Sequence, residues 1–170
     1  MLKTFKLILD KFLEFLTATV MAVLVIVVTW QVITRFIMNN PSSWTEELAI
    51  YLMIWIGLLG AAVALNRKAH LGIDYFVGKL SMKSYLITQL FVFFCIAGFS
   101  ITVLVIGGLK LVTINLINNQ TSPALGIKVA YVYLAVPISG FFITLYSIEF
   151  FIESLLKLVR LSGQKKIVNG

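Results

Sequence analysis

The chain has 170 residues, of which 60% are hydrophobic and 12% charged, and its mean hydropathy is +1.00. These values lie far from those of soluble domains and indicate a membrane protein. The formal net charge of +7 is typical of membrane-protein loops that face anionic lipid, which disfavours nucleic acid as a partner. A single cysteine, Cys95, and a single histidine, His70, exclude an intrachain disulfide and leave too few ligands for a zinc or haem site. We therefore expect one all-α membrane domain over residues 1–170, with no cofactor and no metal.

Four long runs contain no Asp, Glu, Lys or Arg, and each is close to or above the roughly 20 residues that a helix needs to cross the hydrocarbon layer. They predict four transmembrane helices at about residues 13–36, 47–66, 84–110 and 129–156. The first follows three lysines, as in a signal peptide, but its apolar run is too long and lacks a small-residue cleavage site. We interpret it as a retained helix.

The distribution of basic residues predicts the orientation of these helices. Eleven of the 14 Lys and Arg residues lie on the side of the two termini and of the connection between the second and third helices. By the positive-inside rule, both termini are expected in the cytoplasm. Residues 39–47 and 115–126 then form extracytoplasmic connections.

The segment between the second and third helices is too short and too charged to cross the membrane. Within residues 71–82, apolar side chains recur at helical spacing at Ile73, Phe76, Val77 and Leu80. This pattern predicts a short amphipathic helix that lies in the cytoplasmic interface.

Membrane proteins that move ions themselves usually carry an ionisable group deep in the bilayer. None stands near the centre of any predicted span, and the nearest acids, Glu14, Glu149 and Glu153, lie at the cytoplasmic ends. Lys11 and Lys157 lie near them at helical spacing, which favours interfacial ion pairs or subunit contacts. A substrate or proton relay is the alternative. His70 is expected to anchor the turn that follows the second helix, since no acid–base partner is nearby in sequence.

The second predicted helix has two pairs of small residues four positions apart, Gly57 with Ala61 and Gly60 with Ala64. Such pairs let another helix backbone approach closely. Two interpretations stay open: packing within this chain's own bundle, or docking of a partner helix.

Three further residues have structural interpretations. Trp44 falls at the extracytoplasmic boundary and suits the aromatic belt, whereas Trp55 lies in mid-span and must pack against helices or lipid. Pro137 lacks a backbone donor and could kink the fourth helix, a common feature of membrane helices that requires no functional role.

Two adjacent acids, Glu46 and Glu47, precede the second apolar run. Ser43 and Glu46 have the spacing of a capping box, and carboxylates in a first helical turn complement the positive helix end. One acid would suffice for this, so the second suggests an additional partner. Arg35, at the end of the first helix, is the nearest cation within the chain.

The stretch WTEELAIYLMIWIGLLGAAVALNRKAHLGID resembles the signature region of the small, DctQ-type membrane subunit of tripartite ATP-independent periplasmic (TRAP) transporters. The matching positions are Trp44, Glu46, Glu47, Tyr51, Trp55, Gly60, Ala61, Ala62, Arg67, His70 and Asp74. A second match is TSPALGI, residues 121–127, which includes Ser122 and Pro123 and is followed by Pro137 in YLAVP. Lys128 stands where the family often has a proline, so the sequence departs from the family pattern at the start of the fourth helix.

The resemblance implies a division of labour in the bacterial inner membrane. A periplasmic binding protein captures an organic anion such as sialic acid or a C4-dicarboxylate, and a large membrane subunit carries it with sodium ions by an elevator-like movement. The small subunit joins the large one, enlarges its scaffold and helps to hold it among phospholipids. Sodium ions are expected on the partner, and the matched residues of this chain, with Gly57 and Ala64, would serve helix placement and subunit contacts.

Two other classes of function compete with this one. A self-sufficient small multidrug resistance-type exporter also has four helices, but it places a carboxylate within the bilayer, and Glu14 is too close to Lys11 and the membrane edge to fit well. A membrane enzyme or quinone-linked anchor subunit is disfavoured by the shortage of His, Asp and Cys.

Overall fold

The computed structural model describes residues 2–67 and 81–168, and within those ranges it contains helices and no strand. The helical elements are α1 (Leu2–Phe36), α2 (Ser43–Asn66), α4 (Met82–Phe99), the π-helical η1 (Ser100–Gly107), α5 (Gly108–Ile117), α6 (Val129–Tyr133) and α7 (Ala135–Val168). Because α4, η1 and α5 follow one another without a break, they form one long third span. Four stretches are long and apolar enough to cross a membrane: Lys6–Phe36, Ser43–Asn66, Met82–Ile117 and Val129–Leu161. The prediction of four membrane helices is confirmed.

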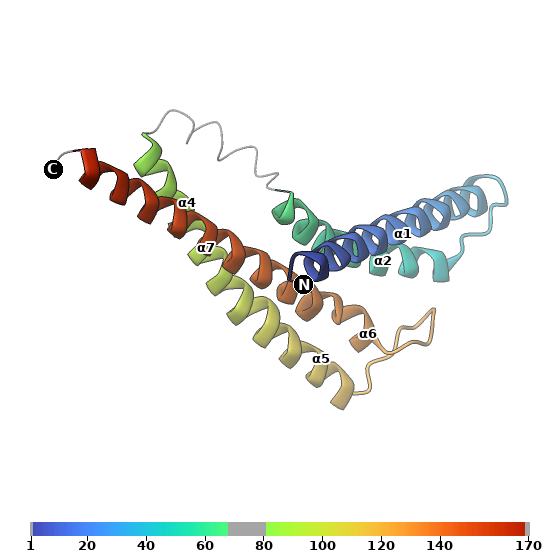
Figure 1. The fold of residues 1–170 in the computed structure, drawn as a ribbon. Helices are drawn as coiled ribbons and strands as arrows, with labels where there is room; N and C mark the ends of the chain where they lie inside the picture. Colours follow the sequence, from blue (N-terminus) through green and yellow to red (C-terminus); the bar gives the residue numbers. More distant parts are fainter. Residues whose placement is uncertain (1, 68–80, 169–170) are drawn as a thin grey trace.

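The four spans are arranged as two helical hairpins. One consists of α1 and α2, and the other places α4, η1 and α5 beside α6 and α7 (Figure 1). The main contact between the hairpins is that of α2 with α7, so α7 is the central helix of the fold.

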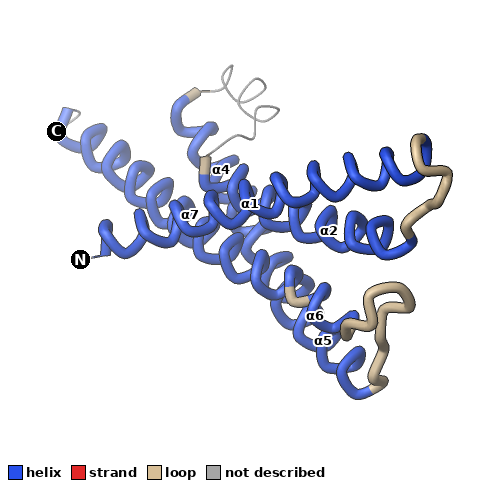
Figure 2. The backbone as a smooth tube through the Cα atoms, turned by 90° about the vertical axis from the view of Figure 1, so that its right-hand side faces the viewer, coloured by secondary structure: helices blue, strands red, loops and turns tan. Residues whose placement is uncertain are grey.

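The two hairpins cross where the start of α1 lies beside the middle of α7, and they diverge toward the end that holds the described loops (Figure 2). Figure 2 shows both described loops, residues 37–42 and 118–128, at the same end of the molecule, which we call the loop end. The first turn of α1 and the last turn of α7 lie toward the opposite end, the terminal end. The buried apolar core lies toward the terminal end and draws on all four spans, with Leu13, Leu59, Phe93 and Phe142 among its members.

The third and fourth spans cross at very short distance because glycines face the partner helix. A Cβ atom at Gly140 would lie 2.6 Å from the Cβ of Leu104, and one at Gly108 would lie 2.9 Å from a methyl group of Val136. Real Cβ atoms do not approach so closely, so these two positions require glycine. At the same crossing the buried Ser100 hydroxyl donates a hydrogen bond to the Gly140 carbonyl, with 2.7 Å between the oxygens.

Pro137 lies in the first turn of α7, where a missing backbone N–H has no helical partner to lose. The helix is interrupted at Leu134, between α6 and α7. The fourth span is therefore broken just before Pro137, which agrees with the structural interpretation of this proline.

Candidate functional site

The signature residues of the second span lie along α2. The helix begins at Ser43 with Ser42 as its N-cap, whose side chain makes no capping hydrogen bond. The predicted capping box of Ser43 and Glu46 is therefore wrong. In a capping box the acid stands three residues after the N-cap, but with Ser42 as the N-cap Glu46 stands four residues after it. Instead, the buried Thr45 hydroxyl donates to the Ser42 carbonyl at 2.8 Å.

The second acid, Glu47, links α2 to the long loop. One carboxylate oxygen accepts a hydrogen bond from the Tyr51 hydroxyl at 2.6 Å, and the other accepts one from the backbone N–H of Ala124 at 2.9 Å. The structure thus brings Glu47 and Tyr51, from the first motif, together with the SPALGI segment, which belongs to the second. Glu47 positions the loop against the start of α2.

Ser122 organises this loop from within. It is 2% exposed, and its hydroxyl accepts a hydrogen bond from the backbone N–H of Leu125 at 3.0 Å. Its own N–H donates to the Ile127 carbonyl at 2.8 Å, and Gly126 closes the turn with a φ of +67°, which favours glycine. Pro123 is exposed beside it. The loop is therefore a compact, internally bonded surface element.

Glu46 points elsewhere. It lines a small cleft of about 260 Å³ together with Gln31, Arg35, Pro41 and Ser42. Arg35 was the predicted cation partner of the second acid, yet among the described ion pairs none joins it to either glutamate. Its guanidinium lies 5.7 Å from the centre of the Phe36 ring instead.

The two small-residue pairs of α2 differ in exposure, but neither glycine is closely packed within this chain. Gly57 and Ala61 are exposed, whereas Gly60 and Ala64 are half-buried. A Cβ atom added at Gly57 would meet no atom within 4 Å. The Gly57–Ala61 pair therefore does not serve close packing within this chain, and docking of a partner helix on this pair stays a prediction.

The two tryptophans of the signature differ in their surroundings. Trp55 packs against the buried core, and Trp44 is 47% exposed at the loop end. Trp44 is thus placed where an aromatic belt residue is expected.

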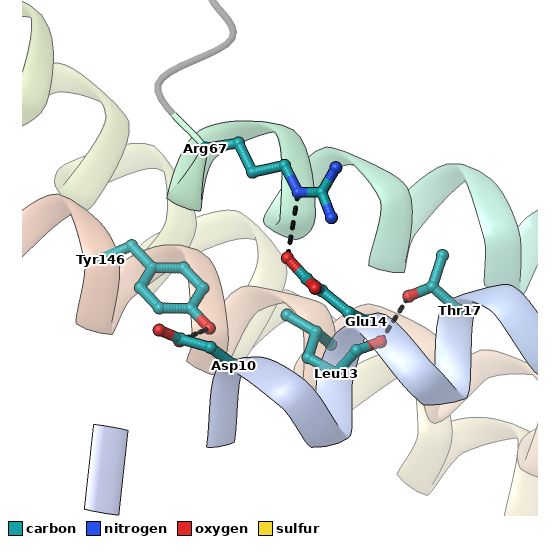
Figure 3. Close-up of polar contacts among 6 residues, drawn as sticks. All are labelled: Asp10, Leu13, Glu14, Thr17, Arg67 and Tyr146. Atoms are coloured by element: carbon teal, nitrogen blue, oxygen red, sulfur yellow. Dashed lines mark hydrogen bonds and ion pairs between the residues drawn. The ribbon is translucent and has the colours of Figure 1, made fainter. Parts of the chain in front are cut away.

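At the terminal end, polar side chains fasten α1 to α2 and α7 (Figure 3). The Arg67 guanidinium donates to the Glu14 carboxylate with an Nε–Oε1 distance of 2.9 Å, and this hydrogen bond raises the pKa of Arg67, which is charged at any working pH. The buried Tyr146 hydroxyl donates to the Asp10 carboxylate at 2.8 Å. These two bonds set the position of the start of α1.

Each of the three terminal acids forms an ion pair, but only Glu153 pairs with a cation named from the sequence. Glu153 pairs with Lys157 at 2.7 Å, and Glu149 pairs with Lys6 of α1. Glu14 pairs with Arg67 and not with Lys11, because α2 ends beside α1 and brings the guanidinium across.

Other predicted residues and elements cannot be placed. His70, Asp74 and most of the predicted interfacial helix at 71–82 lie outside the described residues. Within the described part of the chain, no group of three His, Cys, Asp or Glu side chains could hold a metal ion.

The sequence analysis missed the crossing of Gly108 and Gly140 with Ser100. The third and fourth apolar runs contain glycines and serines, and such small and hydroxyl residues are enriched where membrane helices pack closely and hydrogen-bond to each other. This composition could have indicated the crossing. It also missed Asp10, which precedes the first charge-free run and whose partner Tyr146 lies far along the chain.

Comparisons with known proteins agree with the motifs. Residues 24–157 match the family model described as tripartite ATP-independent periplasmic transporters, DctQ component. The chain is 29% identical over 168 residues to the sialic acid TRAP transporter small permease protein SiaQ of Vibrio cholerae, covering 99% of this chain and 95% of the relative. It is 30% identical over 131 residues to the isethionate TRAP transporter permease protein DctMQ of Oleidesulfovibrio alaskensis, covering 74% of this chain but only 20% of that protein. A C4-dicarboxylate TRAP transporter small permease protein, DctQ of Vibrio cholerae, is 27% identical over 96 residues, which is 56% of this chain and 41% of the relative.

Proposed function

Since the chain belongs to the DctQ-component family of tripartite ATP-independent periplasmic transporters and is a small transport subunit rather than an enzyme, we propose that it pairs with a large, elevator-type membrane subunit. In this role it enlarges the static scaffold of the large subunit during sodium-driven uptake of an organic anion. Sodium and substrate bind to the partner, not to this chain.

Two observations support the pairing. The relative DctMQ is about five times longer than the segment that this chain matches, as expected where a small subunit is part of the same polypeptide as a larger permease. In addition, the Gly57–Ala61 face is small, exposed and unused within this chain. A partner helix can approach such a face closely, and close approach is what drives helix association in lipid.

The scaffold role is supported by where the charges lie. The central stretch of each span contains no Asp, Glu, Lys or Arg, whereas transport sites for ions in membranes are built from such groups. Two of the ion pairs at the terminal end join helices of this chain, Lys6 with Glu149 and Glu14 with Arg67, and a third, Glu153 with Lys157, lies within α7. The single observation that carries the proposal is the family match over residues 24–157.

The finer features follow from the same role. Sialic acid and C4-dicarboxylates are the substrate classes named for two of the relatives, and we propose one of these classes for the complete transporter. The loop end would face the periplasm and the transiently bound binding protein. The terminal end would face the cytoplasm from the inner membrane, with residues 71–82 as an interfacial helix and phospholipid around the spans.

Bulky residues on the small face test the pairing directly. Gly57→Leu and Ala61→Leu should abolish copurification of a large polytopic protein with a C-terminally tagged chain extracted in mild detergent. Because Gly57 has no atom of this chain within 4 Å of a new Cβ, its substitution should leave the chain itself folded. Gly98→Leu is the matched control, since Gly98 is equally exposed and equally free of neighbours on the third span.

Loss of the partner in both α2 variants, with retention in Gly98→Leu, would support the proposal. Recovery of the chain alone or as a self-associated dimer from native membranes would refute it and favour the small-exporter alternative. If a partner stays bound in all three variants, the subunit pairing stands but its assignment to the Gly57–Ala61 face is wrong.

A further inference from the structure

A second cleft, of about 380 Å³, lies between α4 and α7 at the terminal end. Its volume is within the range of about 300–1,000 Å³ that is usual for small-molecule sites. The inner wall is apolar, with Leu86 and Phe93 from α4 facing Phe150 from α7. Phe93 and Phe150 contact each other with 5.4 Å between ring centres, which closes the inner end of the cleft.

The outer part of the cleft is polar and cationic. Lys157 and Arg160 line it from α7 and are exposed, and the half-buried Glu153 carboxylate lines it as well. Lys157 is already paired with Glu153 at 2.7 Å, whereas Arg160 takes part in none of the ion pairs between described residues. The cleft therefore has a net positive charge at its outer part.

Two consecutive side-chain hydrogen bonds connect the apolar inner wall of the cleft with its cationic outer part. The buried Ser154 hydroxyl donates to the Gln89 side-chain carbonyl at 3.2 Å, and the Gln89 amide donates to the Tyr85 hydroxyl at 2.6 Å. Tyr85 is an acceptor in this bond, so its own O–H is available as a donor at the outer part of the cleft.

The shape, the apolar wall and the positive charge of the cleft together indicate which kind of molecule fits it. A partner helix is about 10 Å wide, so the volume of the cleft equals that of only about one helical turn. An acyl chain is thin enough to follow the apolar wall, and a phosphate matches two cations and a hydroxyl donor. Basic pockets between membrane helices are known to bind anionic lipid headgroups. A free phosphate would leave the apolar wall unexplained.

We propose that this cleft binds one anionic phospholipid, with the phosphate at Lys157 and Arg160 and one acyl chain along the wall of Leu86, Phe93 and Phe150. The lipid would contact both α4 and α7, which are the parts of the second hairpin that lie at the terminal end. This site does not depend on the identity of the large subunit or of the transported anion.

Retention of lipid by the complete protein tests the proposal. The full chain, with any subunit that copurifies, is placed in nanodiscs of phosphatidylcholine and phosphatidylglycerol at 4:1, and the lipids that stay bound are counted by native mass spectrometry. One phosphatidylglycerol should be retained in preference to phosphatidylcholine. Lys157→Gln with Arg160→Gln should lower this retention by about 30-fold, because each of the two basic residues near anionic lipid contributes about 1 kcal/mol and about 1.4 kcal/mol is tenfold.

Lys11→Gln is the matched control, because Lys11 is an exposed cation at the terminal end of α1 and lines neither described cleft. It should leave the retained phosphatidylglycerol unchanged, and inorganic phosphate at millimolar concentration should not displace the lipid. Equal loss in Lys11→Gln, equal retention of the two lipids by the unmodified protein, or displacement by phosphate would each overturn the proposal. Unchanged circular dichroism of the double variant shows that it is folded, as expected when an exposed ion pair is removed.

Discussion

The Glu47 carboxylate and the Ala124 backbone amide are 77 residues apart in the chain and form a hydrogen bond of 2.9 Å. This contact holds the long loop beside the first turn of α2, and the Tyr51 hydroxyl, one turn further along the same helix, donates to the same carboxylate. The two adjacent acids therefore have different surroundings: Glu47 binds the loop, whereas Glu46 lines the cleft beside Arg35.

Glu47→Ala should therefore loosen the loop. The Ala124 amide loses its charged acceptor, so local opening of the loop becomes easier, and amide hydrogen exchange across residues 121–127 should speed up several-fold. Glu46→Ala is the control and should leave this exchange unchanged. Faster loop exchange in Glu46→Ala alone would contradict the assignment of the two acids.

Gly140→Ala should destabilise the crossing of the third and fourth spans. The new Cβ would lie 2.6 Å from the Cβ of Leu104, and relief of such overpacking typically costs about 1–3 kcal/mol. Thermal unfolding in detergent, followed by circular dichroism, should show a lower midpoint. Gly98→Ala should be neutral or slightly stabilising, because no neighbour is within 4 Å and alanine favours helix. A midpoint for Gly140→Ala equal to that of Gly98→Ala would show that the helices do not cross at this distance.

Tyr146→Phe should weaken the attachment of α1 to α7. The substitution keeps the ring but removes the donor to the Asp10 carboxylate, and a lost hydrogen bond to a charged group costs about 1.5–3 kcal/mol. The free energy of unfolding, measured with denaturant in mixed micelles, should fall by that amount. Tyr131→Phe, at a residue 57% exposed, should have no effect. Equal values for the two variants would mean that the Asp10 contact contributes nothing.

The loop end should face the periplasm. In a variant with Cys95 replaced by serine, a new cysteine at Asn118 should react with a membrane-impermeant maleimide in intact spheroplasts. A new cysteine at Lys11 should react only after the membrane is opened. The opposite labelling pattern would reverse the orientation that the distribution of basic residues predicts.

The sequence predicted the number of membrane helices because hydrocarbon tolerates no unpaired charge, so charge-free runs mark the spans directly. It could not predict which faces of those helices pack together. In an apolar span, the side that meets lipid and the side that meets another helix have similar composition. Gly57 and Gly60 therefore looked as suitable for close packing as Gly108 and Gly140, and only the fold distinguishes them.

The polar site was predictable in part. Glu47, Arg67 and Ser122 stood out by motif, and the structure gives each a partner. The partners of Glu47 and Arg67 were not predictable, because each of these two bonds joins segments whose separation is set by the fold and not by helical spacing. The Ser122 bond is local, since it lies within the loop and spans three residues. For Ser43 and Glu46 a local rule gave a wrong prediction. Their spacing fits a capping box only if Ser43 is the N-cap, and the N-cap is Ser42.

The central position of α7 has a consequence for biosynthesis. The third span makes its main interhelical contacts with the fourth, and α2 also meets the other hairpin mainly through α7. Because α7 is synthesised last, α2 and the third span are in the membrane without the helix that both of them contact until translation is nearly complete. A nascent chain arrested before residue 129 should hold one hairpin and one separate helix, open to quality-control proteases until the final span arrives.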